Sequence, residues 1–252
     1  MIDLSVNLNK IALIRNSREG DYPSVLAFAE TCIAAGCDGI TVHPRPDQRH
    51  IRPSDVRALA ALIERHPQLE FNIEGNPFAS PQGSYPGLLA LVEETKPHQC
   101  TLVPDSNNQL TSDHGFDLTR SGAELEPIIR QLQAWGVRIS LFMDPDLEQI
   151  RLAKAIGADR IELYTGPYAA AWDQPDTLEA LHERYRQAAQ LAVDIGLGVN
   201  AGHDLNLDNL TRFATIPGLL EVSIGHALTV DALRLGMDSA VRAYKALLAQ
   251  AR

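Results

Sequence analysis

The sequence contains few cysteines, no excess of positive charge and no long hydrophobic run. The three cysteines, Cys32, Cys37 and Cys100, lack a Cys-x-x-Cys spacing, and we expect reduced thiols in the core of a cytoplasmic protein. A formal net charge of −10 argues against nucleic acid and anionic membranes as partners. No apolar run approaches the roughly 18 residues of a transmembrane helix, and the first residues show no secretory signal.

The length and the order of the expected elements indicate a (β/α)8 barrel. The 252 residues match one such barrel of about 250 residues, and short apolar runs alternate with helix-like segments without a linker-like gap. A doubly wound open sheet is the alternative, but eight regular units favour closure, so we expect one catalytic TIM-barrel domain over residues 1–252. The expected strands are 3–8, 39–43, 69–73, 98–103, 138–143, 160–164, 198–201 and 219–224. The expected helices are 22–35, 53–66, 88–95, 123–135, 145–156, 177–195, 207–214 and 230–249.

Titratable residues lie at or just past one end of five expected strands. They are His43, Glu70, Glu162, His203 and His226. Barrel enzymes build their active sites from side chains at the carboxyl ends of several strands. We therefore expect an enzyme in which these side chains, together with Asn7 and Asn200, converge at one mouth of the barrel.

The strand expected at 69–73 carries two carboxylates on one face. Alternation places Glu70, Asn72 and Glu74 together, with Phe71 and Ile73 against the helices. A carboxylate that faces into a barrel is costly unless it is paired or functional. We expect Glu70 to be catalytic, with a buried structural ion pair as the alternative, and Glu74 to cap a loop.

The segment that follows the second strand is rich in cationic side chains. His43, Arg45, Arg49 and His50 lie within eight residues, and Arg binds phosphate or carboxylate with two parallel hydrogen bonds. Near the N-terminus, Asn7 and Asn9 share one face of the first strand. Arg15 and Arg18 follow in an expected loop, where either could reach a phosphate or simply face solvent.

Two Gly-His pairs follow the last two strands, where this fold usually binds phosphate. They are Gly202-His203 and Gly225-His226, and the helices expected after them would point positive dipole ends at an anion. Further back, residues 104–117 form a long polar segment without periodicity, which we expect to be a lid. A divalent metal held by His43, Glu70, Glu162 and His203 is an alternative, but no compact ligand spacing supports it.

Several long motifs resemble the pyridoxine 5′-phosphate synthase family. They occur in the same order over essentially the whole chain: Asn7-x-Asn9-Lys10, Gly39-Ile-Thr-Val-His43-Pro-Arg45, Glu70-Phe-Asn-Ile-Glu74-Gly75, Lys96-Pro-His-Gln-x-Thr-Leu-Val-Pro104, Asn200-Ala-Gly-His203 and Glu221-Val-Ser-Ile-Gly-His226. The resemblance implies a barrel with extra helices, assembled as a homo-oligomer, often an octamer built from dimers. It also implies condensation of two small phosphorylated substrates, 3-amino-2-oxopropyl phosphate and 1-deoxy-D-xylulose 5-phosphate. The implied products are pyridoxine 5′-phosphate, phosphate and water, and no metal or organic cofactor is implied.

The resemblance also assigns roles to individual residues. The general acid/base residues it implies are His43, Glu70 and His203, and Glu162 matches a carboxylate of the family's site. Asn9-Lys10 stands where many members have Asp-His, and we expect both residues to contact substrate. The other implied substrate contacts are Asn7, Arg18, Arg45, His50, Thr111, Asp204 through its backbone, Gly225 and His226.

This reaction requires imine formation, dehydrations and loss of phosphate, and each of these steps includes a proton transfer. His43, Glu70 and His203 suit such steps, because burial tunes the pKa of His and Glu toward neutrality. Two alternatives are another phosphosugar enzyme, such as an aldolase or isomerase, and a non-catalytic phospholigand-binding barrel. A Schiff-base aldolase needs an inward-facing Lys on a strand, and none of the expected strands provides one.

Overall fold

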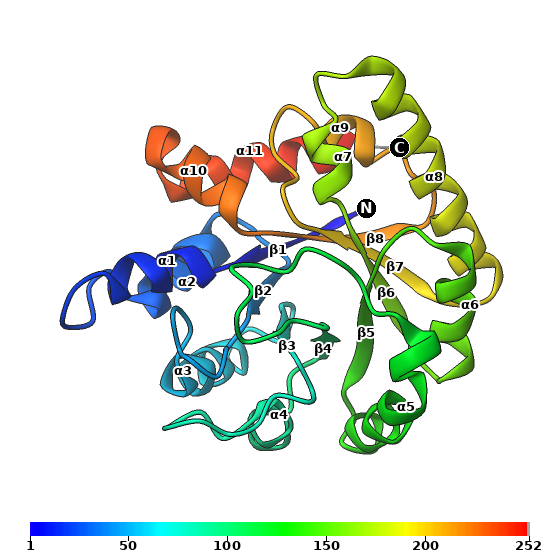
Figure 1. Cartoon of the computed structure of the whole chain (residues 1–252). Helices are drawn as coiled ribbons and strands as arrows, with labels where there is room; N and C mark the ends of the chain where they lie inside the picture. The colour runs from blue at the N-terminus through cyan, green and yellow to red at the C-terminus, as the bar shows by residue number, and fades with distance from the viewer. Residues whose placement is uncertain (251–252) are drawn as a thin grey trace.

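The computed structural model describes residues 1–250 and contains one closed barrel of eight parallel strands (Figure 1). Each strand pairs with the next along the chain, and the first pairs with the last. The expected (β/α)8 barrel is therefore confirmed. The strands are β1 (Asp3–Asn7), β2 (Gly39–Val42), β3 (Glu70–Gly75), β4 (Gln99–Leu102), β5 (Arg138–Met143), β6 (Arg160–Tyr164), β7 (Gly198–Gly202) and β8 (Leu219–Ile224).

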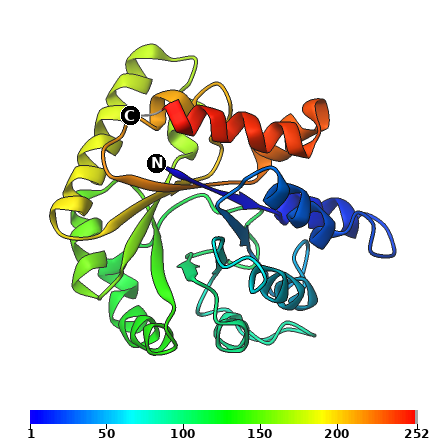
Figure 2. The same cartoon turned by 180° about the vertical axis from the view of Figure 1, so that it is seen from behind.

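Helices surround the barrel on its outside, as views from the two sides show (Figures 1 and 2). Contacts of α10 with α1 and of α11 with α2 bring the two ends of the chain together and close the ring. None of the helices described within residues 1–250 is long and apolar enough to cross a membrane. The helices are α1 (Asn9–Asn16), α2 (Val25–Ala34), α3 (Pro53–Ile63), α4 (Leu88–Thr95), α5 (Leu118–Ala134), α6 (Leu147–Ala155), α7 (Gly166–Ala170), α8 (Pro175–Asp194), α9 (Leu210–Phe213), α10 (His226–Leu235) and α11 (Met237–Gln250).

The helices differ from the expected ones at three places. The segment after β1, expected to be a loop, forms α1, whose first amide at Asn9 donates to Asn7 Oδ1 at 2.9 Å. A short helix, α7, follows β6. The single helix expected at the C-terminus is divided at Gly236, whose φ of +79° is readily adopted by glycine. These extra pieces lie near the carboxyl ends of the strands, where they can build a site.

The hydrophobic core lies between the sheet and the helices, whereas the inside of the barrel is polar. Ile40, Phe71 and Ile161 are examples of the buried apolar side chains that alternate with inward-facing polar ones. Hydrogen bonds inside the barrel join strands that are not neighbours, for example Thr101 Oγ1 to Glu162 Oε2 at 3.4 Å. Barrels of this fold usually fill this space with Val, Ile and Leu. The buried members of this polar interior are Ser5, Thr41, Asn72, Gln99, Thr101, Ser140, Glu162, Asn200, Glu221 and Ser223.

Candidate active site

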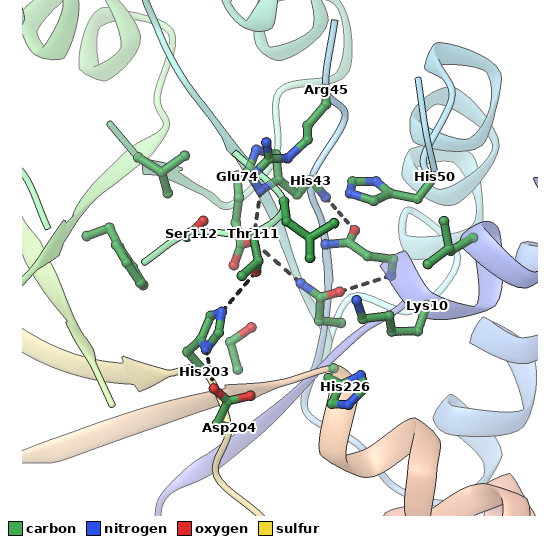
Figure 3. Close-up of a pocket in the computed structure, with 18 of the residues that line it drawn as sticks. Lys10, His43, Arg45, His50, Glu74, Thr111, Ser112, His203, Asp204 and His226 are labelled. Atoms are coloured by element: carbon green, nitrogen blue, oxygen red, sulfur yellow. Dashed lines mark hydrogen bonds and ion pairs between the residues drawn. The ribbon is translucent and has the colours of Figure 1, made fainter. Parts of the chain in front are cut away.

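A cavity of about 370 Å³ opens at the carboxyl ends of the strands. Side chains from all around the barrel line it, and Figure 3 shows several of them pointing toward one another. Twelve of the fourteen site residues expected from the sequence line this cavity. They are Asn7, Asn9, Lys10, His43, Arg45, His50, Thr111, Glu162, His203, Asp204, Gly225 and His226.

Glu70 does not lie at this mouth, and the predicted placement is wrong. It is the first residue of β3 and pairs in register with Gly39, the first residue of β2. Its carboxylate accepts hydrogen bonds from Arg138 at the start of β5. Four residues of a strand span about 13 Å, so Glu70 is that far from the position of Glu74. Although burial alone would raise the pKa of Glu70, the hydrogen bonds and charge of Arg138 lower it overall.

Asn200, also expected at the mouth, lies inside the barrel near its foot. Its side-chain amide contacts Glu221 Oε2 at 3.2 Å and Gln99 Oε1 at 3.3 Å, and its Oδ1 accepts from Arg160 at 3.0 Å. The foot of the barrel is therefore an ionic and amide network that includes the Glu70–Arg138 pair. Alternation put Glu70 and Asn200 on the correct face. The expected strand 69–73, however, already has Glu70 at its amino end, away from the carboxyl ends where the other candidates lie.

Arg18 does not reach the cavity of this chain. It is exposed and is absent from the cavity lining. The other candidate, Arg15, is buried and binds both carboxylate oxygens of Asp55, at 2.5 and 2.9 Å. Asp55 also accepts from the Arg52 amide at the start of α3. Arg15 is therefore a structural residue that fastens α1 to α3.

His43 is buried at the end of β2 in a cluster of carboxyl groups. Its Nδ1 lies 3.8 Å from Glu74 Oε2 and its Nε2 lies 4.0 Å from Asp105 Oδ2. Burial, reinforced by the positive charge of Arg45, holds the pKa of His43 well below its ordinary value. Burial and neighbouring carboxylates raise the pKa of Glu74 to about 8. At neutral pH the two contacting groups are therefore a neutral imidazole and a protonated carboxyl, not an ion pair.

Residues of the first turn of α1 support His43 from the side. The His43 amide donates to Asn9 Oδ1 at 2.9 Å. Asn7, the last residue of β1, reaches Glu74 Oε2 with its Nδ2 at 3.4 Å. Because α1 starts directly at Asn9, it carries Lys10 to the cavity wall, where Lys10 adds a cation to the lining.

His50 forms the far side of this cationic wall. Its ring lies 6.1 Å from that of His43, and its Nδ1 accepts from the Ile51 amide at 2.9 Å. Burial, together with the positive charge of Arg45, lowers the pKa of His50 to about 3. A neutral His50 with Nδ1 occupied presents an N–H at Nε2 as a hydrogen-bond donor.

Glu162 extends from the centre of β6 toward the cavity. Burial and the nearby Glu74 and Glu221 carboxyls raise its pKa well above the ordinary value. The carboxyl group packs against Gly202 of the neighbouring strand, so closely that a Cβ at this position would overlap Glu162 Oε1. Gly202 therefore makes room for the Glu162 side chain.

His203 is held between the lid and Asp204. Its Nδ1 lies 2.8 Å from Asp204 Oδ2 and its Nε2 lies 3.0 Å from the Thr111 hydroxyl. The bond from His203 lowers the pKa of Asp204, so this carboxylate is ionised and accepts the proton of Nδ1. Nε2 is then the basic nitrogen, facing Thr111. His203 and Asp204 have φ values of +87° and +59°, an uncommon conformation for residues with a side chain.

The lid, residues 104–117, covers the cavity with Leu110, Thr111 and Ser112. Two guanidinium groups fasten it through backbone carbonyls. Arg49 donates to Gln109 O at 2.8 Å and to Asn107 O at 3.1 Å, and Arg45 donates to Gln109 O at 3.1 Å. Arg45 also pairs with the buried Asp105 at the lid's base. The structure thus places the lid over the site, as expected.

One helix start, not two, faces the cavity. Helix α10 begins at His226, and Gly225 and His226 line the cavity there. After His203, by contrast, the chain forms bends and turns, and α9 begins only at Leu210. The helix expected at 207–214 is shortened to Leu210–Phe213 and does not start at the Gly202-His203 pair, so only α10 directs its dipole at an anion.

Sequence comparison decides the family. The family model described as "Pyridoxal phosphate biosynthesis protein PdxJ" matches residues 4–250.

The chain belongs to this family. It is 57% identical over 250 residues to pyridoxine 5′-phosphate synthase of Xanthomonas oryzae pv. oryzae, covering 98% of this chain and 96% of the relative. It is 54% identical over 251 residues to the enzyme of the same name from Albidiferax ferrireducens, covering 99% and 98%.

Solved structures of other proteins share the fold at low identity. KGPDC from Streptococcus mutans aligns with a TM-score of 0.63 at 10% identity, covering 100% of this chain and 99% of that chain. The 4-hydroxy-2-oxoglutarate aldolase from TTHB1 aligns with a TM-score of 0.59 at 18% identity, covering 97% and 94%. These likenesses support the barrel fold alone.

The alternative metal set is not assembled in this PdxJ-family chain, because Glu70 lies at the opposite end of the barrel from His43 and His203. Within residues 1–250, no group of three or more His, Cys, Asp or Glu side chains is arranged to hold a metal ion.

Three residues of the site were not predicted in their observed roles. Glu74 contacts His43, Asp105 pairs with Arg45, and Arg49 holds the lid. One signal was present for Glu74, which shares a face with Glu70 and is closer to the carboxyl end of β3. The expected strand ended at Ile73, but β3 continues to Gly75, and this extension places Glu74 at the mouth.

Proposed function

We propose that this chain is a pyridoxine 5′-phosphate synthase. It condenses 3-amino-2-oxopropyl phosphate with 1-deoxy-D-xylulose 5-phosphate to give pyridoxine 5′-phosphate, phosphate and water. The observation that carries the proposal is one covered cavity that joins the imidazoles of His43 and His203 to a lining able to bind phosphate. The two substrates are proposed from the full-length match to the PdxJ family and to relatives named pyridoxine 5′-phosphate synthase.

Phosphate groups bind at two sides of the cavity. On one side, the start of α10 offers the backbone of Gly225 and the imidazole of His226, with Lys10 on the neighbouring helix. On the other side, Arg45 and the Nε2–H of His50 are available as donors. These two groups of donors in one cavity lining suit two phosphorylated substrates.

His43 and His203 move protons. Nε2 of His203 carries its lone pair toward the cavity, because Asp204 holds the proton on Nδ1. His43 is neutral and is therefore ready to accept a proton from the amino ketone or from the imine formed with the second substrate. The substrate amine is the nucleophile. The lid excludes water from the imine intermediates, which water would otherwise hydrolyse.

Glu70 is the third acid/base residue that the resemblance implies, and this role is a proposal. From the foot of the barrel, Glu70 can exchange protons with the cavity only along the polar interior. Arg138 holds its carboxylate ionised, so it would act as a proton acceptor.

Assembly and location are further proposals. We propose a cytoplasmic homo-oligomer, an octamer built from dimers as the family resemblance implies. Arg18 is exposed near α1, where a partner subunit could meet it. Light scattering of wild type and of Arg18→Ala tests this. A monomeric wild type would contradict assembly, and an oligomeric Arg18→Ala that has lost substrate affinity would support binding across subunits.

The decisive experiment is mass spectrometry after mixing the purified, metal-free chain with both substrates. We expect pyridoxine 5′-phosphate and inorganic phosphate in equal amounts. A chain that binds both substrates without forming product would instead be a phospholigand-binding barrel. A phosphosugar aldolase working through a Schiff base is disfavoured, since none of the eight strands described contains a lysine.

A further inference from the structure

We propose that Glu74 is a catalytic acid of this site, delivering a proton to the substrate beside His43. This inference rests on the proposed function and adds a residue that the family resemblance does not name. Its first support is position. Glu74 lines the cavity, and its carboxyl oxygen Oε2 lies 3.8 Å from His43 Nδ1 and 3.4 Å from Asn7 Nδ2.

The second support is the absence of a structural partner. In residues 1–250, no Lys or Arg nitrogen comes within 4.0 Å of the Glu74 carboxyl, whereas Arg138 binds Glu70. Arg45, the nearest guanidinium in the lining, pairs with Asp105 instead. Evolution tolerates a buried carboxyl without a cation when function requires it, because burial otherwise costs stability.

The third support is that Glu74 does not cap the following loop. The loop is organised by Asn76, whose Oδ1 accepts from the Phe78 amide at 2.8 Å and whose Nδ2 donates to the Asp105 carbonyl at 2.8 Å. Glu74 accepts no backbone hydrogen bond from the part of the chain that the structure describes. The loop-capping role expected from the sequence is therefore carried by Asn76, and Glu74 is free to face the cavity.

The surroundings of Glu74 keep it protonated. Burial is the main cause, and the carboxyls of Asp105 and Glu221 add repulsion that Arg45 only partly offsets, so the pKa of Glu74 rises to about 8. Glu162 faces the same space, and its pKa is raised as well, by burial and by the carboxyl of Glu74. The groups around Glu74 are Asn7 on β1, His43 after β2, Arg45 beyond it, Cys100 and Thr101 on β4, Asp105 in the lid, Glu162 on β6 and Glu221 on β8.

The proton serves one of the dehydration steps. His43 takes a proton from the carbon next to the carbinol, and the electron pair of that C–H bond forms the new double bond. The C–O bond of the carbinol breaks, and the Glu74 proton converts the departing hydroxide into water. The resulting carboxylate of Glu74 and imidazolium of His43 are 3.8 Å apart, so proton return between them restores both groups. No oxidant or metal is needed.

The test compares Glu74→Gln, Glu74→Asp and the control Glu93→Gln, which changes an exposed glutamate of α4. Glu74→Gln keeps the shape and loses the acid, so we expect a fall in kcat of at least about 10²-fold with little change in KM. Glu74→Asp should recover part of this loss, and Glu93→Gln should match wild type. A Glu74→Gln variant within about threefold of the wild-type kcat would overturn the proposal.

The pH profile gives a second readout that a purely structural role would not produce. Wild-type kcat should fall on the alkaline side near pH 8, as Glu74 loses its proton, and Glu74→Asp should shift that limb. If Glu74→Gln does not fold, a wild-type profile that stays flat from about pH 7 to pH 9 still overturns the proposal. A wild type that makes no product with both substrates refutes the proposed function and this step with it, whereas an active wild type with a normal Glu74→Gln refutes Glu74 alone.

Discussion

The Thr111 hydroxyl and Nε2 of His203 lie 3.0 Å apart and join the tip of the lid to the loop after β7. Because Asp204 holds the proton of Nδ1, the Thr111 hydroxyl donates to the nitrogen that we propose as a base. The lid therefore orients the imidazole of His203 through this hydrogen bond while it covers the cavity. When the lid opens, Nε2 is released to water.

Thr111→Val tests this coupling, since it removes the hydroxyl and keeps the shape. A hydrogen bond of this kind contributes about 0.5–1.5 kcal/mol, so we expect kcat/KM to fall by about 2- to 13-fold and the melting temperature to fall by only a few degrees. Thr111→Ser, which keeps the hydroxyl, should be close to wild type. Steady-state kinetics and a melting curve on both variants decide the matter, and equal activity of the two would break the link between lid and base.

Glu70→Gln tests whether a carboxylate at the foot of the barrel contributes to turnover as Glu74 does at the mouth. The Arg138 pair is partly exposed, with 38% of the Glu70 side chain accessible, so its loss should cost at most about 1 kcal/mol. We expect a smaller loss of turnover than in Glu74→Gln, because Glu70 cannot touch a substrate at the mouth. A stable Glu70→Gln variant that loses about 10²-fold in kcat would support the proposed acid/base role through the polar interior, whereas near-normal turnover would show that Glu70 is structural.

Gly202→Ala should damage the site through Glu162. The added methyl overlaps the Glu162 carboxyl, which must turn away, and overpacking of this kind costs about 1–3 kcal/mol. We expect a lower melting temperature together with reduced kcat. Gly122→Ala is the matched control, since its methyl would lie 3.6 Å from Ile156 in ordinary contact. Loss of activity in both variants would remove the special role of Gly202.

Stability should decrease as pH rises through the neutral range. The Glu74 carboxyl titrates near its ordinary value of 4.5 in the unfolded chain and near 8 in the folded one. Between these values the folded state holds a proton that the unfolded state has released, so the free energy of unfolding falls by up to about 1.4 kcal/mol per pH unit. Urea titrations at pH 7.5, 8 and 8.5, above the range where the unfolded His43 and His50 lose their protons, should show a shallower fall in Glu74→Gln, with the remainder due mainly to Glu162 and Glu221. Identical slopes would show that Glu74 is ionised in the folded state.

Turnover should survive exhaustive chelation. The proposed steps use side-chain proton transfer and the amine of the substrate, and the alternative ligand set is divided between the two ends of the barrel. Activity before and after EDTA treatment, with the residual metal measured, checks this. If EDTA abolishes turnover and one divalent ion restores it, His43 and His203 would have to be assigned as ligands.

Strand positions were predicted well because inward and outward residues alternate with a period of two. Three strands, at 138–143, 160–164 and 219–224, have the expected bounds. Periodicity tells which face a residue occupies, and the strand bounds tell its height along the barrel axis. Glu70 lies at the amino end of the expected strand 69–73 and in register with Gly39, the first residue of β2. The prediction for Glu70 failed because facing the interior does not by itself bring a side chain to the carboxyl mouth.

The cavity lining was largely predictable because most of it lies directly after a strand. What could not be predicted depends on contacts between distant segments. Arg49 reaches carbonyls of the lid 58 to 61 residues away, and neither partner carries a local signal. Helix α1 escaped prediction because Arg15 and Asn16 resemble a polar loop until their bonds to Asp55 and to the His50 carbonyl are seen.

Because the apolar core lies outside the barrel, successive residues of one strand have different roles, one in packing and the next in the polar interior. On β3, Phe71 and Ile73 anchor the strand to the helices, while Asn72 and Glu74 remain available for chemistry. A slip of register by a single residue would exchange the two sets, placing carboxylates against the helices and aromatic rings in the cavity. The penalty for such a slip is larger here than in a barrel filled with aliphatic side chains on both faces. Only one alignment of the strands satisfies both faces of the sheet, so the polar interior disfavours misaligned strand pairing during folding.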